Sequence, residues 1–231
     1  MEFIAEIGLN YNSNKGLISE MIRQAALSGA DYAKLQVGWR DKEGEINQLT
    51  KDDLNLFISM CSYYEIKPLF SVFHSAAWNL IKSTNQKIKV VKIASRTLKG
   101  DKELVKDINK TVERCIISTG MEKIENAKYE KINGDFLWCV AKYPTLPYEL
   151  SEMPLNFKNS GFKGFSDHSQ GITASLMAIS RGAEIIERHF TLDKSDTTIR
   201  DHSLSSTPEE FASLTSTGRE LNRLYKIINE Q

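Results

Sequence analysis

The feature that most constrains the fold is an alternation of short apolar segments with amphipathic helical segments along the whole chain. Eight segments rich in β-branched and aromatic residues are predicted as strands, at 3–9, 32–37, 68–73, 89–94, 114–118, 136–141, 162–166 and 184–190. Segments with helical periodicity follow them, at 16–28, 51–64, 76–83, 101–109, 124–131, 150–156 (a weak pattern), 172–181 and 208–228. Strands that each lead into a helix pair in parallel through right-handed crossovers.

Strand–helix units of similar length favour a sheet that closes on itself. Successive predicted strands start 21 to 36 residues apart, which leaves room for one helix and short loops in each unit. We therefore predict a single (β/α)8 TIM barrel, of the α/β class, spanning residues 1–231 as one domain. A doubly wound open sheet is the alternative, because its strands alternate with helices in the same way.

Composition narrows the classes of function. Lys and Arg total 30, as do Asp and Glu, so the formal net charge is zero. We therefore expect no nucleic-acid partner and no membrane surface, although a local basic pocket remains compatible with this balance. The three cysteines are widely spaced in apolar segments and are expected to be reduced core residues. With no signal peptide or membrane span recognisable, a cytoplasmic protein is expected.

Polar and ionisable residues stand at the carboxyl end of nearly every predicted strand. In a barrel, these ends meet and form the active site. The residues are Glu6, Asn10, Lys34, Gln36, Ser71, Lys92, Ser95, Ser118, Thr119, Lys142, Tyr143, Ser166, His168, Glu187 and His189. An unpaired ammonium in an apolar strand costs on the order of several kcal/mol. Lys34 and Lys92 beside serines therefore indicate an anion pocket, and salt-bridged or surface-reaching lysines are the alternative.

Two of the four histidines, His168 and His189, end the last two strands. Because side chains alternate between the faces of a strand, Ser166 and His168 share a face and Asp167 points away, which excludes a catalytic triad within "SDH". By the same count, Glu187 shares a face with His189. Neutral imidazoles suit manganese, zinc or iron, so the pair indicates a metal site. Two hydrogen-bonded core histidines are the alternative.

Carboxylates elsewhere in the sequence are candidates for further metal ligands. Glu6, Asp201 or a bound substrate could complete the coordination of a metal held by the two histidines. The dinucleotide-binding fingerprint and the phosphate-binding P-loop are both absent from the sequence.

Seven segments carry a resemblance to a known family. They are "FIAEIGLNYN", "ADYAKLQ", "VVKIAS", "IISTGM", "YPT", "GFSDHSQGI" and "AEIIERHFTLD", and the resemblance covers nearly the whole chain, from about Phe3 to Leu214. In this order and approximate spacing, they resemble the sialic acid synthase family. That family condenses phosphoenolpyruvate with an N-acetylated amino sugar to a nine-carbon 2-keto acid. The resemblance implies a metal-dependent transferase of carbohydrate biosynthesis, with phosphoenolpyruvate and a sugar as its partners.

The resemblance also implies roles for individual residues. A divalent metal, typically Mn²⁺ with Mg²⁺ or Co²⁺ as alternatives, would be held by His168 and His189. The phosphate and carboxylate of phosphoenolpyruvate would be bound by Lys34, Lys92, Ser95, Ser118 and Ser166. The sugar would face Gln36, Tyr143 and Asp201. The residues expected to take part in catalysis are Glu6, Lys92, His168, His189 and Asp201.

The sequence departs from the family pattern at several pocket positions. The departures are Tyr11 and Ser13 in "NYNS", Val72 in "FSV", Arg96 and Thr97 in "ASRT", and Trp138 and Ala141 in "WCVA". Val72 replaces a hydroxyl and Thr97 an acid. An alternative to the enzyme is therefore a non-catalytic relative that binds a metal, a phosphosugar or a partner protein.

Two positively charged residues join the sugar side of the pocket. Arg96 stands where the family has glycine, and Lys142 precedes Tyr143. Together they predict an acceptor sugar with an anionic group. The alternative is that Arg96 and Lys142 point into solvent, or that Arg96 fills the space left by a missing lid domain. The family's C-terminal antifreeze-like domain, which reaches across a dimer to cover the partner's sugar site, has no counterpart before Gln231. The resemblance therefore implies that another chain, in a homodimer or as a separate partner, supplies this lid, or that the site has none.

Overall fold

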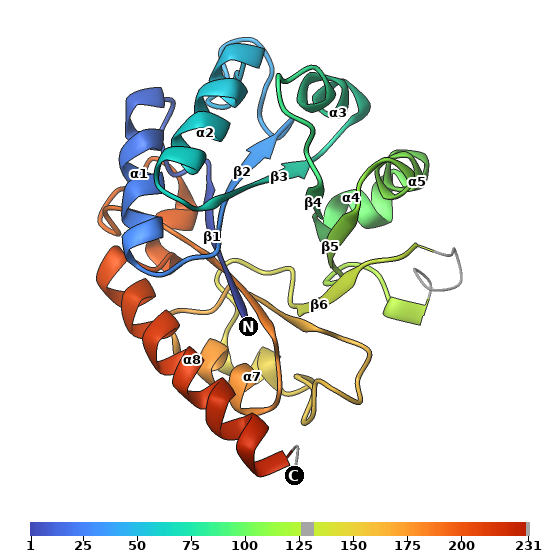
Figure 1. Cartoon of the computed structure of the whole chain (residues 1–231), viewed down its shortest axis with the longest axis vertical. Helices are drawn as coiled ribbons and strands as arrows, with labels where there is room; N and C mark the ends of the chain where they lie inside the picture. Colours follow the sequence, from blue (N-terminus) through green and yellow to red (C-terminus); the bar gives the residue numbers. More distant parts are fainter. Residues whose placement is uncertain (126–131, 230–231) are drawn as a thin grey trace.

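The computed structural model, which describes residues 1–125 and 132–229, is a closed barrel of parallel strands. The strands are β1 (Glu2–Gly8), β2 (Tyr32–Val37), β3 (Lys67–Val72), β4 (Val90–Ile93), β5 (Arg114–Ser118), β6 (Asp135–Cys139), β7 (Gly164–Asp167) and β8 (Ile185–His189). Each strand pairs with the next, and β8 pairs with β1. The helices surround the strands (Figure 1). The predicted (β/α)8 barrel is thus confirmed, and the open sheet is excluded.

The helices follow their strands in chain order. They are α1 (Lys15–Leu27), α2 (Lys51–Tyr63), α3 (Ser75–Lys82), α4 (Ser95–Gly100), α5 (Lys102–Thr111), α7 (Thr173–Ser180) and α8 (Pro208–Asn229), with 3₁₀ turns η1 (Pro147–Leu150) and η2 (Arg200–Leu204). Polar capping residues fix the positions at which several helices begin. Thr50 and Asp53 form a reciprocal capping box on α2, and Asp101 accepts a 3.0 Å hydrogen bond from Leu104 at the start of α5.

The connection between β6 and β7 does not contain the helix that its sequence predicted. Residues 151–156 form turns instead of the helix expected at 150–156, and only the 3₁₀ turn η1 precedes them. Pro154 explains this, because proline cannot supply the amide hydrogen that a helix interior needs. The segment covers the barrel instead through buried Met153 and Phe157. The helix expected at 124–131 lies mostly outside the described residues, and α4 and η2 were not predicted.

The barrel interior is built in two layers. The lower layer is an apolar cluster of Ile4, Tyr32, Leu69, Ile116, Leu137 and Ile185, with Val90 packed against it. Since every second residue of a strand faces the same side, the layer above it consists of the residues two positions further on. These are Glu6, Lys34, Ser71, Lys92, Ser118, Cys139, Ser166 and Glu187. The apolar layer closes the barrel below, and the polar layer lies above it at the carboxyl ends of the strands.

Gly164 continues the lower layer on β7, where no side chain would fit. A Cβ atom there would come within 2.0 Å of the carbonyl oxygen of Ile185 on the neighbouring strand. Glycine therefore lets β7 and β8 approach closely just below the two histidines that end these strands.

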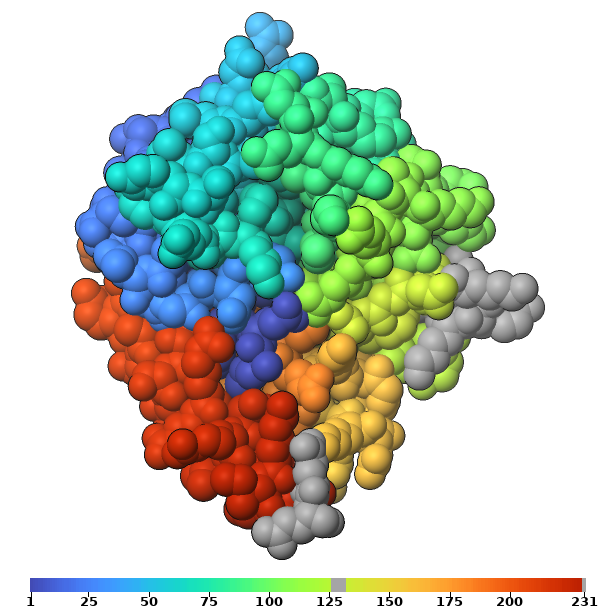
Figure 2. Space-filling model, in the orientation of Figure 1, coloured from blue at the N-terminus to red at the C-terminus, as the bar shows by residue number. Residues whose placement is uncertain are grey.

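The face carrying the amino ends of the strands is covered by side chains. The first residues of the chain, in dark blue, lie near the middle of the face in Figure 2, beside α8 in red. Because the strands are parallel and β1 begins at Glu2, this face is opposite the carboxyl ends. None of the helices in the described ranges combines the length and apolar character that a membrane crossing needs.

Candidate active site

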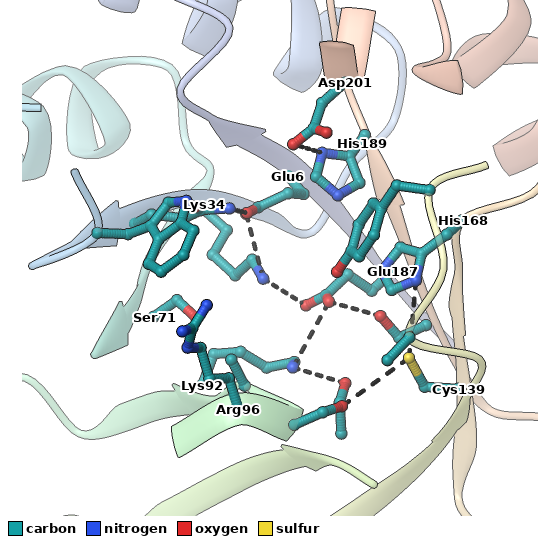
Figure 3. Close-up of a pocket in the computed structure, with 18 of the residues that line it drawn as sticks. Glu6, Lys34, Ser71, Lys92, Arg96, Cys139, His168, Glu187, His189 and Asp201 are labelled. Atoms are coloured by element: carbon teal, nitrogen blue, oxygen red, sulfur yellow. Dashed lines mark hydrogen bonds and ion pairs between the residues drawn. The ribbon is translucent and has the colours of Figure 1, made fainter. Parts of the chain in front are cut away.

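The polar layer lines one cavity of about 540 Å³ at the carboxyl ends of the strands. Every residue to which the sequence analysis assigned a role lies in its wall: Glu6, Lys34, Gln36, Lys92, Ser95, Arg96, Ser118, Lys142, Tyr143, Ser166, His168, His189 and Asp201. Figure 3 shows Glu6, Lys34, Lys92, His168 and His189 converging from different strands. A cavity of this size falls in the range of small-molecule sites.

Glu187 is the centre of the buried charge in this cavity. Its Oε2 lies 2.9 Å from Nζ of Lys34, and its Oε1 lies 3.5 Å from Nζ of Lys92. Ser166 donates a hydrogen bond of 2.8 Å to the same Oε1. Burial by itself would raise the pKa of Glu187, but the two ammonium groups outweigh burial and hold this pKa well below its usual range. Glu187 is therefore an anion that compensates both lysines.

The two lysines differ in how well their charges are compensated. Burial disfavours the charged form of Lys34, but Glu187 and Glu6 outweigh it and raise its pKa above the ordinary value. The distance from Nζ of Lys34 to Oε2 of Glu6 is 3.1 Å. Burial lowers the pKa of Lys92, and repulsion from Lys34 adds to this effect. A further anion bound in the cavity would thus favour the charged form of Lys92.

Glu6 is a buried carboxyl whose pKa is shifted in the direction that suits proton exchange. Burial raises its pKa, and repulsion from Glu187 adds to burial, although Lys34 opposes both. Gln36 donates a hydrogen bond of 2.7 Å to Oε1 of Glu6 and so fixes the orientation of the carboxyl. A positioned carboxyl with a raised pKa can act as a general acid or base.

His168 is oriented by the backbone of the preceding strand. Its Nδ1 lies 2.8 Å from the carbonyl oxygen of Val140, and this nitrogen donates to the carbonyl. The other ring nitrogen, Nε2, then keeps its lone pair. The sulfur of Cys139 lies 3.7 Å from Nδ1, and the ring of Tyr143 packs on the imidazole with a centroid distance of 4.1 Å.

His189 faces His168 across the ends of β7 and β8. The ring centroids of the two histidines are 5.6 Å apart. Burial lowers the pKa of His189 to about 4, so its imidazole is neutral at ordinary pH. Its Nδ1 is buried without a hydrogen-bond partner in the described part of the chain, and the nearest carboxylate oxygen, Oδ2 of Asp201, lies 3.9 Å away.

These features fit a divalent metal, though not one held by protein ligands alone. Among residues 1–125 and 132–229, no group of three or more His, Cys, Asp or Glu side chains is arranged to hold a metal. Substrate or water would have to complete coordination by the two imidazoles. The unpartnered Nδ1 of His189 beside Asp201 suits the arrangement in which the non-ligating nitrogen of a metal-bound histidine donates to a carboxylate.

Asp167 lies outside the cavity, as the alternation of faces predicted. Its side chain is fully buried and pairs with Arg188 at 2.7 Å. Asp167 also accepts hydrogen bonds from Ser169 and Ser175. The pair joins β7 and β8 from the side facing away from the pocket, immediately next to His168 and His189. It is therefore a structural ion pair, and no Ser–His–Asp triad is present within "SDH".

Arg96 follows Ser95 at the end of β4 and lies at the rim of the cavity. Its guanidinium lies over the indole of Trp39, 4.6 Å from the ring centroid. Trp39 packs in turn on Phe73, with ring centroids 5.5 Å apart. The arginine is thus held on an aromatic platform that comes from the loop after β2.

Two other positions, Lys142 and Thr97, differ from what the sequence indicated. Lys142 lines the cavity, but its ammonium pairs with Glu149 and is largely exposed, so its charge is already compensated. Thr97 was considered a pocket residue, yet it is buried outside the cavity wall and donates a 2.8 Å hydrogen bond to the carbonyl of Val72. Thr97 therefore links the start of α4 to the end of β3 and adds no side chain to the cavity wall.

Several residues of the cavity received no role from the sequence. They are Trp39, Ser71, Phe73, Ala94, Met121, Cys139, Ala141, Pro144, Glu187 and Arg200. Glu187 and Ser71 were visible as strand-end residues, so the period of two could have found them. Cys139 is free and buried, as expected, but it also borders the cavity. Trp39 and Arg200 lie in connections without periodicity, where no sequence signal pointed to them.

Comparison with known proteins agrees with this geometry. The model of the NeuB family matches residues 42–227. An uncharacterised protein of Methanocaldococcus jannaschii is 32% identical, with 96% of this chain and 71% of that protein aligned. The N-acetylneuraminate-9-phosphate synthase of Homo sapiens is 28% identical, with 95% of this chain and 70% of that protein aligned.

A solved structure extends the comparison to three dimensions. The N-acetylneuraminic acid (sialic acid) synthetase of Leptospira borgpetersenii serovar Hardjo-bovis superposes with a TM-score of 0.84. It is 26% identical, and the match covers 96% of this chain and 84% of that one. Together with the family match, this similarity shows that the chain belongs to the NeuB family, to which the sialic acid synthases are related.

Proposed function

We propose that this protein condenses phosphoenolpyruvate with an N-acylated amino sugar or a related aldose, and that it releases phosphate and a sialic-acid-like 2-keto acid. The observation that carries the proposal is that one cavity holds two buried lysines beside serines and, at the ends of β7 and β8, two facing imidazoles. The first group suits a small polyanion. The second suits a metal and the carbonyl oxygen of an acceptor.

Phosphoenolpyruvate would occupy the side of the cavity formed by β2, β4, β5 and β7. Lys34 and Lys92 are 3% and 1% exposed, so they would meet its phosphate and carboxylate away from bulk water. Hydroxyl groups close to them are supplied by Ser95, Ser118 and Ser166. In the unliganded pocket, Glu187 compensates the charge of the two lysines and keeps their ammonium groups in place. An incoming anion would compete with Glu187 for the lysines.

A divalent metal, which we propose to be Mn²⁺ with Mg²⁺ or Co²⁺ as alternatives, would be held by His168 and His189. When bound, it would polarise the aldehyde oxygen of the acceptor. The protein's own residues orient this site: Val140 fixes the ring of His168, and Asp201 lies beside His189. Gln36 and Tyr143 border the space left for the sugar.

The proposed reaction makes one carbon–carbon bond and breaks one carbon–oxygen bond. C3 of phosphoenolpyruvate attacks the aldehyde carbon of the open-chain sugar, and the aldehyde oxygen takes up a proton. Water then adds at C2 and loses a proton, and the bond between C2 and the phosphate oxygen breaks to give the ketone and phosphate. Glu6, whose carboxyl has a raised pKa and is positioned by Gln36, is the group we assign to proton movement at the reacting carbon.

A phosphate-release assay tests this function. Wild-type protein is incubated with phosphoenolpyruvate, Mn²⁺ and a panel of hexosamines and sugar phosphates, with Lys92→Ala as the matched inactive control. We expect phosphate release that requires an acceptor and is lost in the variant. If wild type and Lys92→Ala release phosphate equally slowly with every acceptor, the enzyme proposal is wrong and the non-catalytic alternative is favoured.

A further inference from the structure

The guanidinium of Arg96 is a positively charged group at the cavity rim with no anionic partner among the residues that the structure describes. It lies over Trp39 at 4.6 Å, and Trp39 is held by Phe73. Within the described ranges, Arg96 makes no ion pair and donates no hydrogen bond to protein. The contact with the indole uses none of the N–H donors of Arg96 in a hydrogen bond within the described residues, so they can bind a ligand.

The other cations of the cavity wall are compensated. Lys34 and Lys92 pair with Glu187, and Arg200 pairs with Asp201 at 3.3 Å. Lys142 pairs with Glu149. Arg96 thus differs from them, because a ligand would not have to displace a carboxylate in order to reach its charge.

The position of Arg96 separates it from the proposed phosphoenolpyruvate site. Lys34 and Lys92 are buried at the bottom of the cavity, whereas Arg96 is exposed. In the closed barrel, β4 is opposite β8, so Arg96 lies across the cavity from His189. Figure 3 shows Arg96 on the side of Lys92 and Ser71, with His189 and Asp201 on the other side. An acceptor whose aldehyde is near the histidines would extend its far end towards Arg96.

We propose that Arg96 determines acceptor specificity by binding an anionic group, a phosphate or a carboxylate, on the acceptor sugar. This inference rests on the proposed function, because it assigns the substrate class of the same cavity. A guanidinium fixed on an aromatic ring presents two parallel N–H groups, which match the two oxygens of a carboxylate or phosphate. Neutral hexosamines would leave this charge without a partner and would be poor acceptors.

The test compares three acceptors in the phosphate-release assay. They are N-acetylmannosamine, its 6-phosphate and N-acetylmannosaminuronic acid, so that the last two distinguish a phosphate from a carboxylate. The variants are Arg96→Gln, which removes the charge, and Arg96→Lys, which keeps it without the bidentate edge. Lys99→Gln is the matched control, since it removes one charge from the same helix at an exposed position outside the cavity wall.

We expect wild type to prefer an anionic acceptor. Arg96→Gln should lower kcat/KM for that acceptor about 10- to 100-fold, as expected for a lost charge-assisted contact. Arg96→Lys should have an intermediate value. The values for N-acetylmannosamine, and the KM for phosphoenolpyruvate, should stay close to those of wild type. Lys99→Gln should resemble wild type with all three sugars.

Binding measurements keep this inference distinct from the proposed function. If no acceptor gives phosphate release, the proposed function fails, but calorimetry with the same three sugars still tests Arg96. Tighter binding of an anionic sugar that is lost in Arg96→Gln would support the role of Arg96. Equal binding or turnover of neutral and anionic sugars overturns the inference. An equal loss of binding or turnover in Arg96→Gln for all three sugars also overturns the inference. A changed KM for phosphoenolpyruvate in this variant, with unchanged acceptor preference, does the same.

Discussion

Nζ of Lys34 lies 2.9 Å from Oε2 of Glu187, and the two side chains are 4% and 6% exposed. Lys92 and Ser166 contact the other oxygen of the same carboxylate. Glu6 adds a second carboxyl on the far side of Lys34, so two ammonium groups and two carboxyl groups share one buried cluster. The cluster is balanced before any ligand binds, and the bound anion must therefore exchange with Glu187 for contact with the lysines.

Glu187→Gln should make this exchange visible as a change in stability. Without the carboxylate, the two buried ammonium groups lose their main partner, and breaking a buried ion pair costs about 3–5 kcal/mol. Inorganic phosphate should restore part of this loss by pairing with the lysines. Thermal unfolding with and without phosphate measures the effect, and we expect phosphate to raise Tm more in the variant than in wild type.

A variant at Glu184 controls for the loss of a carboxylate at a position outside the cavity. Glu184 immediately precedes β8 at its amino end, and it is absent from the wall of the active-site cavity. Glu184→Gln should respond to phosphate as wild type does. The idea of an exchangeable cluster is wrong if Glu187→Gln, Glu184→Gln and wild type all gain the same Tm from phosphate.

Removing either buried lysine should weaken the binding of phosphoenolpyruvate. A charge-assisted contact contributes about 1.5–3 kcal/mol, so Lys34→Ala and Lys92→Ala should each raise Kd roughly 10- to 100-fold. Isothermal calorimetry measures this, with the exposed Lys99→Ala as the control. An unchanged Kd in both buried-lysine variants would mean that the lysines serve only the ion pairs with Glu187.

The fold was predictable because the pattern along the chain is regular. A period of two places alternate strand residues on one face, so the apolar layer at Ile4 and Leu69 implies an inward-facing layer at Glu6 and Ser71. The helix prediction at 150–156 was wrong for a local reason, because Pro154 interrupts the weak helical pattern. Short elements such as η2 carry too few residues for a period to be recognised.

The members of the site were easier to predict than their pairings. Alternation placed Ser166 and His168 on the cavity side, but it could not show that Glu187 would contact two lysines from β2 and β4. Such contacts depend on how a barrel brings distant strands to a common centre. Likewise, the sequence showed that Arg96 and Lys142 were both cations, and only the structure shows that Glu149 compensates Lys142 and that Arg96 has a stacking partner instead.

The proposed metal site predicts a specific change in metal content. After incubation with Mn²⁺ and removal of unbound metal, wild type should retain about one equivalent, because two imidazoles face each other at the strand ends. The His168→Ala, His189→Ala double variant should retain much less by elemental analysis. His74→Ala is the control, since His74 pairs with Asp41 at the start of α3 and is absent from the cavity wall. Equal metal in wild type and the double variant would leave the two histidines as core residues.

The ion pair of Asp167 and Arg188 should stabilise the strand ends that carry the two histidines. Both side chains are at most 1% exposed, and Arg188 also donates to the carbonyls of Ser169 and Leu204. Asp167→Ala would leave a buried guanidinium without its carboxylate, so the free energy of unfolding should fall by about 3–5 kcal/mol. Chemical denaturation measures this change.

Two comparisons identify the cause of that loss. Replacing both members, Asp167→Leu with Arg188→Met, should cost less than Asp167→Ala alone, because no buried charge is then left uncompensated. Glu103→Ala, which breaks an exposed pair with Lys106 on α5, should change stability little. If Asp167→Ala is as mild as Glu103→Ala, or if the double replacement costs as much as the sum of its single variants, the buried charge is not what makes this contact important. The strand ends below His168 and His189 must then be held by packing, with Gly164 allowing the close approach of β7 and β8.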